Sequence, residues 1–119
     1  MIGTVEKGRR GEELALQYLL ENGYRPLERN FRAPGGEVDF IVELDALLVF
    51  VEVKYRPRGF AGAGMEAVTQ KKQRRIVKAA GEYLCKTDQF TRPMRFDVVE
   101  ITAEGVIHVE DAFSGGWSC

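Results

Sequence analysis

The sequence is poor in the features that cross-link, anchor or export a protein. Only two of its 119 residues are cysteine, Cys85 and Cys119, and their spacing matches no metal-ligand motif. This usage favours a reducing compartment over a disulfide framework. No apolar run approaches the length of a membrane-spanning helix, and the charged N-terminus does not resemble a signal peptide. We therefore expect a cytoplasmic protein that does not enter a membrane.

Other absences narrow the chemistry. The chain has a single histidine, His108, and no cluster of His and Asp residues, which argues against a metal-dependent phosphohydrolase of small substrates. The glycines of residues 59–64 (GFAGAG) lack the GK[ST] of a nucleotide-binding loop, and we interpret them as a mobile flap. No recognition helix or zinc module for reading bases is evident.

The net charge of −1 conceals an uneven distribution along the chain. Residues 1–95 contain all 17 Lys and Arg residues and 13 acids, which gives +4, whereas residues 96–119 contain no base and 5 acids, which gives −5. A basic body of this kind can bind a polyanion through one face, although ordinary surface charge explains it equally well.

The pattern of apolar residues predicts one domain over residues 1–119, an α/β fold with a central sheet covered by helices. A chain of this length buries roughly two thirds of its unfolded surface and needs no cross-links. Gly23 is well suited to end the first helix in the left-handed conformation. The expected helices are 6–22 and 66–84, and the expected strands are 25–28, 38–42, 47–53, 94–101 and 105–113, with loops at 29–36 and 56–64.

Charged residues interrupt the two apolar strands 38–42 and 47–53. If an even-length hairpin joins them, opposed residues have numbers that sum to 91, and Asp39 faces Glu52. Glu37 then faces Lys54, and all four side chains lie on one face of the sheet. An odd-length loop would move Asp39 to the other face.

Two carboxylates so close together repel each other unless a cation lies between them. A divalent metal bound by oxygen ligands would serve, with Lys54 beside it. The alternative is an ion-pair network in which Lys54 neutralises Glu37 and Glu52. The geometry alone does not separate these interpretations.

A third carboxylate comes from the first helix. At 100° per residue, Glu12 lies in the middle of the apolar face, while Glu13 points to the polar side. Gly8 and Gly11 lie on the same side as Glu12 and would let the helix approach the sheet. We expect Glu12 to point toward Asp39 and Glu52, unless it serves as a dipole-stabilised residue at the helix N-terminus.

A helix with RRGEELA, followed by GEVDFI and VFVEVKYR, resembles the PD-(D/E)xK nuclease superfamily. Its signature would be Asp39 and Glu52-Val53-Lys54, although Val38 stands where the superfamily often has proline. The Glu12 element is similar to that of archaeal-type Holliday junction resolvases. Nearly the whole chain resembles the YraN-type family of uncharacterised bacterial proteins, through GRRGEELALQYLLENGYRPLERNFR, GGEVDFIV, LVFVEVKYR, AVTQKKQRR and RFDVVEI.

This resemblance implies a restriction endonuclease-like core, a central mixed β-sheet flanked by helices. It also implies that Asp39 and Glu52 hold Mg²⁺ or Mn²⁺. The Val53 carbonyl would be a further ligand, and Glu12 would complete the shell directly or through water. Lys54 would orient or activate the attacking water and stabilise charge on the phosphate.

The helix 66–84 carries basic residues on one face and mainly apolar residues on the other, with Gln73 embedded among the apolar ones. Lys72 and Gln73 also match the VTxxKQ pattern of the YraN-type family. A solvated face is the alternative, but a helix after such a strand flanks the substrate groove in the resembled superfamily. We predict backbone contacts to nucleic acid from Arg10, Arg29, Arg32, Arg56, Lys71, Lys72, Gln73, Arg74 and Arg75.

The predicted function is a metal-dependent nucleic-acid phosphodiesterase, an endonuclease acting on branched or structured DNA. The rival is a non-catalytic nucleic-acid-binding or adaptor module that kept the fold and the acids. By analogy with resolvase-like relatives, we expect a homodimer. His108 and Asp97 have structural roles as their simplest explanation, and Trp117 could stack on a base or anchor the tail.

Overall fold

The computed structural model describes residues 4–58 and 68–115. Five strands form one sheet in the order β1-β2-β3-β4-β5. Neighbouring strands are antiparallel, except that β3 and β4 are parallel. The elements, in chain order, are α1 (Thr4–Glu21), β1 (Arg25–Ala33), β2 (Gly36–Leu44), β3 (Leu47–Arg56), α3 (Gln70–Thr87), β4 (Met94–Thr102) and β5 (Gly105–Phe113).

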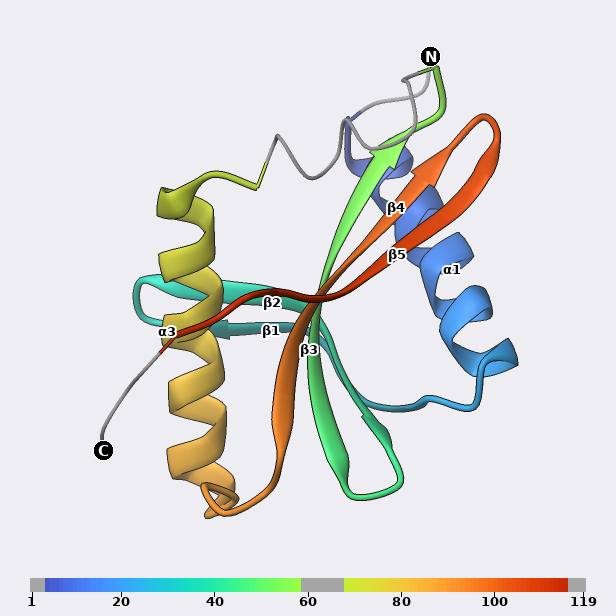
Figure 1. The fold of residues 1–119 in the computed structure, drawn as a ribbon. Helices are drawn as coiled ribbons and strands as arrows, with labels where there is room; N and C mark the ends of the chain where they lie inside the picture. The colour runs from blue at the N-terminus through green and yellow to red at the C-terminus, as the bar shows by residue number, and fades with distance from the viewer. Residues whose placement is uncertain (1–3, 59–67, 116–119) are drawn as a thin grey trace.

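The two helices cover opposite faces of this mixed sheet (Figure 1). On one face, Ile76 and Tyr83 of α3 pack against a buried cluster that includes Phe50. On the other face, Leu19 of α1 packs with Phe40. The predicted fold class, an α/β fold with a central mixed sheet flanked by helices, is therefore confirmed, and the arrangement is consistent with a restriction endonuclease-like core.

The helix ends fix where the functional side chains emerge. Gly23 has a φ of 85° and ends α1 as predicted, and the N–H of Tyr24 donates to the Leu19 carbonyl at 3.0 Å. The α3 helix begins at Gln70, after the capping residue Thr69, four residues later than the predicted start at residue 66. The Thr69 hydroxyl accepts from the Lys72 N–H at 3.2 Å, which caps the first turn.

Two further sequence predictions are wrong. The loop predicted at residues 29–36 is largely strand, because β1 continues to Ala33 and pairs with β2 as far as Gly36. Periodicity misses this because β1 is an edge strand with mostly exposed side chains. The RFDVV pattern around Asp97 predicts an edge-like strand, but β4 lies between β3 and β5.

Two glycines let the helices approach the sheet closely. A Cβ atom on Gly11 of α1 would lie 2.6 Å from the Tyr55 Cβ on β3, as the sequence predicts for this side of the helix. A Cβ atom on Gly36 of β2 would lie 2.3 Å from the Arg75 carbonyl oxygen on α3. Backbone contact leaves no flexible group to yield, so Gly36 determines how closely α3 approaches β2.

We expect Gly36→Ala to destabilise the protein by about 1–3 kcal/mol, because the added methyl group overpacks this contact and forces α3 outward. Urea unfolding followed by circular dichroism measures the change. Lys86→Ala, at an exposed position near the end of α3, is the control and should shift stability by less than about 0.5 kcal/mol. Equal stability of Gly36→Ala and wild type would show that the contact is not constraining.

The remaining sequence predictions concern membrane-spanning helices, the cysteines and the segments outside the described residues. Within the described ranges, neither helix is long and apolar enough to span a membrane. Cys119 lies outside the described residues, so the expectation of reduced cysteines stays a prediction. The glycine segment 59–64 and Trp117 lie outside the described residues.

Candidate functional site

The candidate site lies where β2 and β3 separate. Their pairing runs from Leu44–Leu47 to Phe40–Val51, with residue numbers that sum to 91 as predicted. Beyond Phe40, β2 continues with β1, and beyond Val51, β3 continues with β4. The strands diverge at this point (Figure 1), which leaves backbone donors without a strand partner.

Asp39 occupies this split. Its Oδ2 accepts the Val53 N–H at 2.8 Å, so a side chain replaces the missing strand partner. Continuing the register by one position places Asp39 opposite Glu52, and the two side chains are hydrogen-bonded to each other. The split thus holds the carboxylate of Asp39 next to that of Glu52.

Glu52 is buried, with only 2% of its surface exposed. Its Oε2 is 3.3 Å from the Lys54 Nζ and 3.6 Å from the Lys72 Nζ. Its Oε1 is also buried and has no hydrogen bond to any described residue. A buried carboxylate oxygen without a partner is costly, so this oxygen calls either for the proton of Asp39, whose carboxyl group is hydrogen-bonded to Glu52, or for a bound cation.

The ion pairs of Lys54 and Lys72 differ from the predicted network, in which Lys54 neutralises both Glu37 and Glu52. Glu37 pairs with Lys72 at 3.3 Å, and its second pairing is a 3.9 Å contact with Arg32. Of these acids, Lys54 therefore pairs only with Glu52, and Lys72 pairs with both Glu52 and Glu37. Burial would lower the pKa of Lys72, but the charges of Glu52 and Glu37 raise it above its ordinary value.

The Asp39 carboxyl is strongly perturbed. Burial, together with the negative charge of Glu52, raises its pKa from 3.8 to about 8, while the Val53 N–H and Lys72 act in the opposite direction. Like charges this close disfavour full ionisation of both groups. Such perturbation is common at functional sites, and a bound cation would relieve it.

This perturbation has a consequence for stability. The folded protein keeps the Asp39 proton up to about pH 8, whereas the unfolded chain releases it near 3.8. Between these pH values the folded state binds more protons, so stability falls as pH rises. We expect metal-free Asp39→Asn to gain stability over wild type between pH 5 and 8, by on the order of a few kcal/mol at pH 8.

Thermal unfolding in a chelating buffer across this pH range measures the difference, and the amide oxygen introduced by Asp39→Asn can still accept the Val53 N–H. Asp45→Asn, at an exposed turn position, is the control and should show no such trend. A stability difference that does not grow with pH would contradict the assignment of a buried, repelled carboxyl.

Glu12 shares a cavity with Asp39. The cavity measures about 360 Å³ and is lined by Glu12, Asp39, Val53, Lys54, Tyr55 and Arg56. Glu12 is half-buried, and its Oε2 accepts a long hydrogen bond of 3.4 Å from Asn30. The helix begins at Thr4, about two turns earlier, so Glu12 is not at the N-terminus of its own helix.

Oxygen donors converge here, but no full metal-ligand shell is present. Within residues 4–58 and 68–115, no group of three or more His, Cys, Asp and Glu side chains is placed to hold an ion. The donors that fit are the adjacent carboxylates of Asp39 and Glu52. The unbonded Oε1 of Glu52 supports that fit, and carboxylate oxygens suit Mg²⁺ or Mn²⁺.

The residues predicted to bind nucleic acid fall into different environments. Lys71, Arg74 and Arg75 are exposed on α3 and form no ion pair with a described residue. Lys72 instead joins the acids, and the Gln73 Nε2 donates to the Val68 carbonyl at 3.1 Å, inside the helix cap. Only Lys71, Arg74 and Arg75 of these five residues are thus exposed, whereas Lys72 and Gln73 contact other parts of the protein.

The predicted arginines do not all converge on the cavity. Arg56 lines it, and its buried Nε has no hydrogen bond to a described residue. Arg29 pairs with Glu13 at 2.9 Å, and Arg32 lies 79% exposed near Glu37. Arg10 is exposed and lines a different surface cavity on α1.

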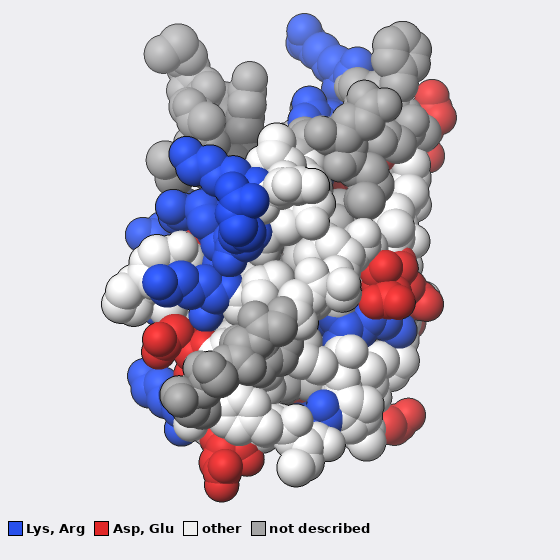
Figure 2. Space-filling view, turned by 60° about the vertical axis from the view of Figure 1, so that its left-hand side comes forward, with Lys and Arg blue, Asp and Glu red and all other residues white. Residues whose placement is uncertain are grey.

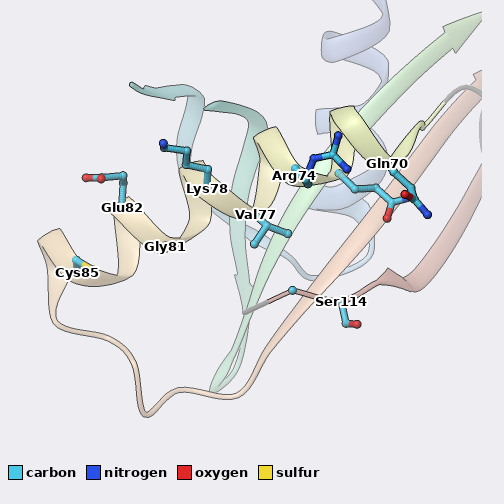
Figure 3. Close-up of a pocket in the computed structure, with 10 residues that line it drawn as sticks. Gln70, Arg74, Val77, Lys78, Gly81, Glu82, Cys85 and Ser114 are labelled. Atoms are coloured by element: carbon cyan, nitrogen blue, oxygen red, sulfur yellow. The ribbon is translucent and has the colours of Figure 1, made fainter. Parts of the chain in front are cut away.

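A larger cavity, of about 640 Å³, runs along α3 beside the segment that contains Ser114 (Figure 3). Arg74 and Lys78 line it together with the apolar Val77. None of the buried carboxylates lines it, so it is separate from the split between β2 and β3.

Sequence reasoning missed a second polar cluster. The buried Asp97 accepts hydrogen bonds from Arg95 at 2.7 Å on both carboxylate oxygens and contacts the His108 Nε2 at 2.7 Å. His108 in turn contacts the Tyr18 hydroxyl at 2.9 Å through Nδ1. Burial would raise the pKa of Asp97, but these hydrogen bonds lower it. The cluster ties α1, β4 and β5 together, which supports structural roles for Asp97 and His108.

The comparison with known proteins covers the part of the chain that contains the candidate site. The profile of the uncharacterised protein family UPF0102 matches residues 11–101, which include Glu12, Asp39, Glu52 and Lys72. A UPF0102 protein from Geobacter metallireducens is 46% identical over 110 residues, covering 89% of this chain and 90% of the relative.

Two further relatives show the same extent of similarity. A UPF0102 protein from Persephonella marina is 43% identical over 109 residues, covering 90% of this chain and 92% of the relative. One from Clostridioides difficile is 38% identical over 110 residues, covering 91% and 96%. The chain therefore belongs to the uncharacterised protein family UPF0102, the YraN-type family that its sequence pattern indicates.

Proposed function

We propose that this protein is a metal-dependent nucleic-acid phosphodiesterase, an endonuclease that acts on branched or otherwise structured DNA. The observation that carries the proposal is the pair Asp39 and Glu52. These two adjacent carboxyl groups are held in the split between β2 and β3, next to two lysines. A protein gains little stability from placing two buried acids together, so a role in ligand binding explains them better.

Asp39 and Glu52 would hold Mg²⁺ or Mn²⁺, with the Val53 carbonyl and Glu12 as further donors. When bound, such an ion polarises a phosphate and lowers the pKa of a coordinated water. Glu12 lines the same cavity as Asp39, and the Val53 N–H keeps the Asp39 carboxylate in place. A backbone donor thus positions Asp39, whereas the side chains of Lys54 and Lys72 hold Glu52.

Lys54 supplies positive charge beside the acids. Its Nζ is 3.3 Å from Glu52, and its side chain is 21% exposed, so it can reach both the carboxylate and an incoming phosphate. Preorganised charge at this position would stabilise the phosphate as it becomes more negative in the transition state. Arg56, whose Nε has no described partner, adds a second donor to the same cavity.

The exposed basic face of α3 would hold the nucleic-acid backbone. Lys71, Arg74, Arg75 and Lys78 are exposed and form no ion pair with a described residue. Lys and Arg side chains gather on this side of the molecule, as Figure 2 shows. Lys72 follows Lys71 in the helix and reaches Glu52, so the exposed basic face begins beside the acids.

One observation fits both the adaptor alternative and a purely structural ion-pair network. Lys54 and Lys72 both form ion pairs with Glu52 and neutralise it. Such a network explains the lysines, but it does not explain why the Asp39 carboxyl, with its raised pKa, is buried beside Glu52. A divalent cation bound by both carboxylates would explain this placement.

A cleavage panel tests the proposal. Purified protein is incubated with branched, nicked, duplex and single-stranded substrates, in DNA and RNA forms, with Mg²⁺ or Mn²⁺. We expect cleavage of at least one branched DNA, loss of cleavage in EDTA, and no cleavage by Glu52→Gln. Binding without cleavage of any substrate with either metal would favour the adaptor module.

A further inference from the structure

Lys72 occupies an unusual place for a residue on a basic helix. Its Nζ lies between two acids, 3.3 Å from the Glu37 Oε1 and 3.6 Å from the Glu52 Oε2. Its side chain is only 26% exposed, whereas its neighbour Lys71 is exposed and forms no ion pair with a described residue. Lys72 therefore belongs to the carboxylate site and not to the exposed basic face.

The start of α3 is built to hold Lys72 there. The Thr69 hydroxyl caps the helix by accepting the Lys72 N–H at 3.2 Å, and the Gln73 amide binds the Val68 carbonyl at 3.1 Å. One turn later, Gly36 lets the Arg75 carbonyl approach β2. The first turn is thus fixed against β2, which aims the Lys72 side chain at Glu37 and Glu52.

We propose that Lys72 is a built-in counter-ion of the carboxylate site, which competes with a divalent cation for Glu52 and is released toward a substrate phosphate when the cation binds. This inference rests on the proposed function, because it takes Asp39 and Glu52 as the cation ligands. It assigns Lys72 a role in the site itself, in place of a general contact to the nucleic-acid backbone.

Formal charge supports the exchange. A cation that binds Asp39 displaces the proton of its carboxyl group. With Asp39, Glu37 and Glu52 then ionised, and with Lys54 and Lys72 protonated, the five groups without the cation sum to −1. A divalent cation changes the sum to +1. The other two charged residues that line the cavity, Glu12 and Arg56, have opposite signs and cancel. One positive charge is then in excess, which matches the single negative charge of a phosphodiester.

A competing cation weakens metal binding, so its removal should strengthen it. We expect Lys72→Met, which keeps a chain of similar length, to bind Mn²⁺ about three- to tenfold more tightly than wild type. Lys72→Arg keeps the charge and should retain wild-type affinity within about twofold. Lys71→Met, which removes a neighbouring exposed charge, is the matched control and should also stay within twofold.

Electron paramagnetic resonance of free Mn²⁺, at fixed pH and ionic strength, gives these affinities without any assay of activity. Asp39→Asn is included to locate the ion. Circular dichroism confirms folding, and Lys72→Gln replaces Lys72→Met if the latter does not fold. Tighter binding of Mn²⁺ to the Lys72 variant than to wild type supports the counter-ion, including the case where wild type binds too weakly to measure.

Two results would overturn the inference, and they are distinguishable. If wild type binds Mn²⁺ through Asp39 but Lys72→Met binds no more tightly, the counter-ion role is wrong and the proposed metal site stands. If neither wild type nor any Lys72 variant shows binding that depends on Asp39, both the counter-ion and the proposed function are wrong.

Discussion

Lys54→Ala is expected to cut nucleic acid about 10²–10³-fold more slowly than wild type while it binds the same substrate with nearly unchanged affinity. A single preorganised donor to a transition state typically contributes this much to the rate. Lys54 lies 3.3 Å from Glu52, beside the proposed ion and away from the exposed face of α3. Its charge should therefore matter most when the phosphate becomes more negative.

The variant should remain folded, because Lys72 still neutralises Glu52 in its absence. Single-turnover cleavage measures the chemical step, and fluorescence anisotropy in the Glu52→Gln background measures binding without cleavage. Lys71→Ala is the matched control, since it removes one lysine from the exposed face and should leave the single-turnover rate within about threefold. Equal losses of rate and affinity in Lys54→Ala would instead make Lys54 a general substrate contact.

The Lys71/Arg74/Arg75 triple alanine variant should show the opposite behaviour, with intact chemistry at low salt and failed binding at higher salt. Lys72 is left out of this variant, because it contacts the acids and Lys71 does not. All three remaining residues are exposed and form no ion pair with a described residue. Contacts to phosphates release counter-ions, so each lost contact flattens the dependence of log K on log salt by about one.

Affinity measured across a salt series in the Glu52→Gln background gives that slope, and we expect the triple variant to lose about three. Lys86→Ala removes a charge from the same helix, but 11 residues beyond Arg75, roughly 16 Å along the axis. It should change the slope by less than one. A triple variant with the wild-type slope would place the nucleic-acid interface elsewhere.

The hairpin register followed from the assumption of an even-length turn between β2 and β3, which Asp45 and Ala46 provide. Both faces of these strands are covered by helices, so the apolar pattern alone does not decide between registers. With the even-length turn, the sequence places Asp39 opposite Glu52. The split of the strands beyond Phe40 and Val51 was not predictable, because it arises from the pairing of β2 with β1 and of β3 with β4.

The position of Lys72 shows the limit of a helical projection. On a projected wheel, Lys72 belongs with the basic residues of its helix, and nothing local separates it from Lys71. Its actual environment depends on where the helix starts, after Thr69, and on how closely Gly36 admits α3 to the sheet. Such contacts between distant segments leave no periodic signal.

The cluster around Asp97 escaped prediction for a similar reason. Asp97 and His108 lie on neighbouring strands that are offset by a register shift between Phe96 and Val98. Tyr18 comes from the other end of the chain and reaches His108 only because α1 packs on that face. The sequence indicated residues with polar groups in apolar strands, but it could not pair them.

Anomalous diffraction from a crystal soaked in Mn²⁺ tests the central claim most directly, because it locates the ion without reference to any substrate. We predict one strong peak in contact with carboxylate oxygens of both Asp39 and Glu52, and no peak at that position in Asp39→Asn crystals. A soaked crystal with no Mn²⁺ at these two residues, and with Lys54 and Lys72 still paired to Glu52, would contradict the account and leave an ion-pair network in its place.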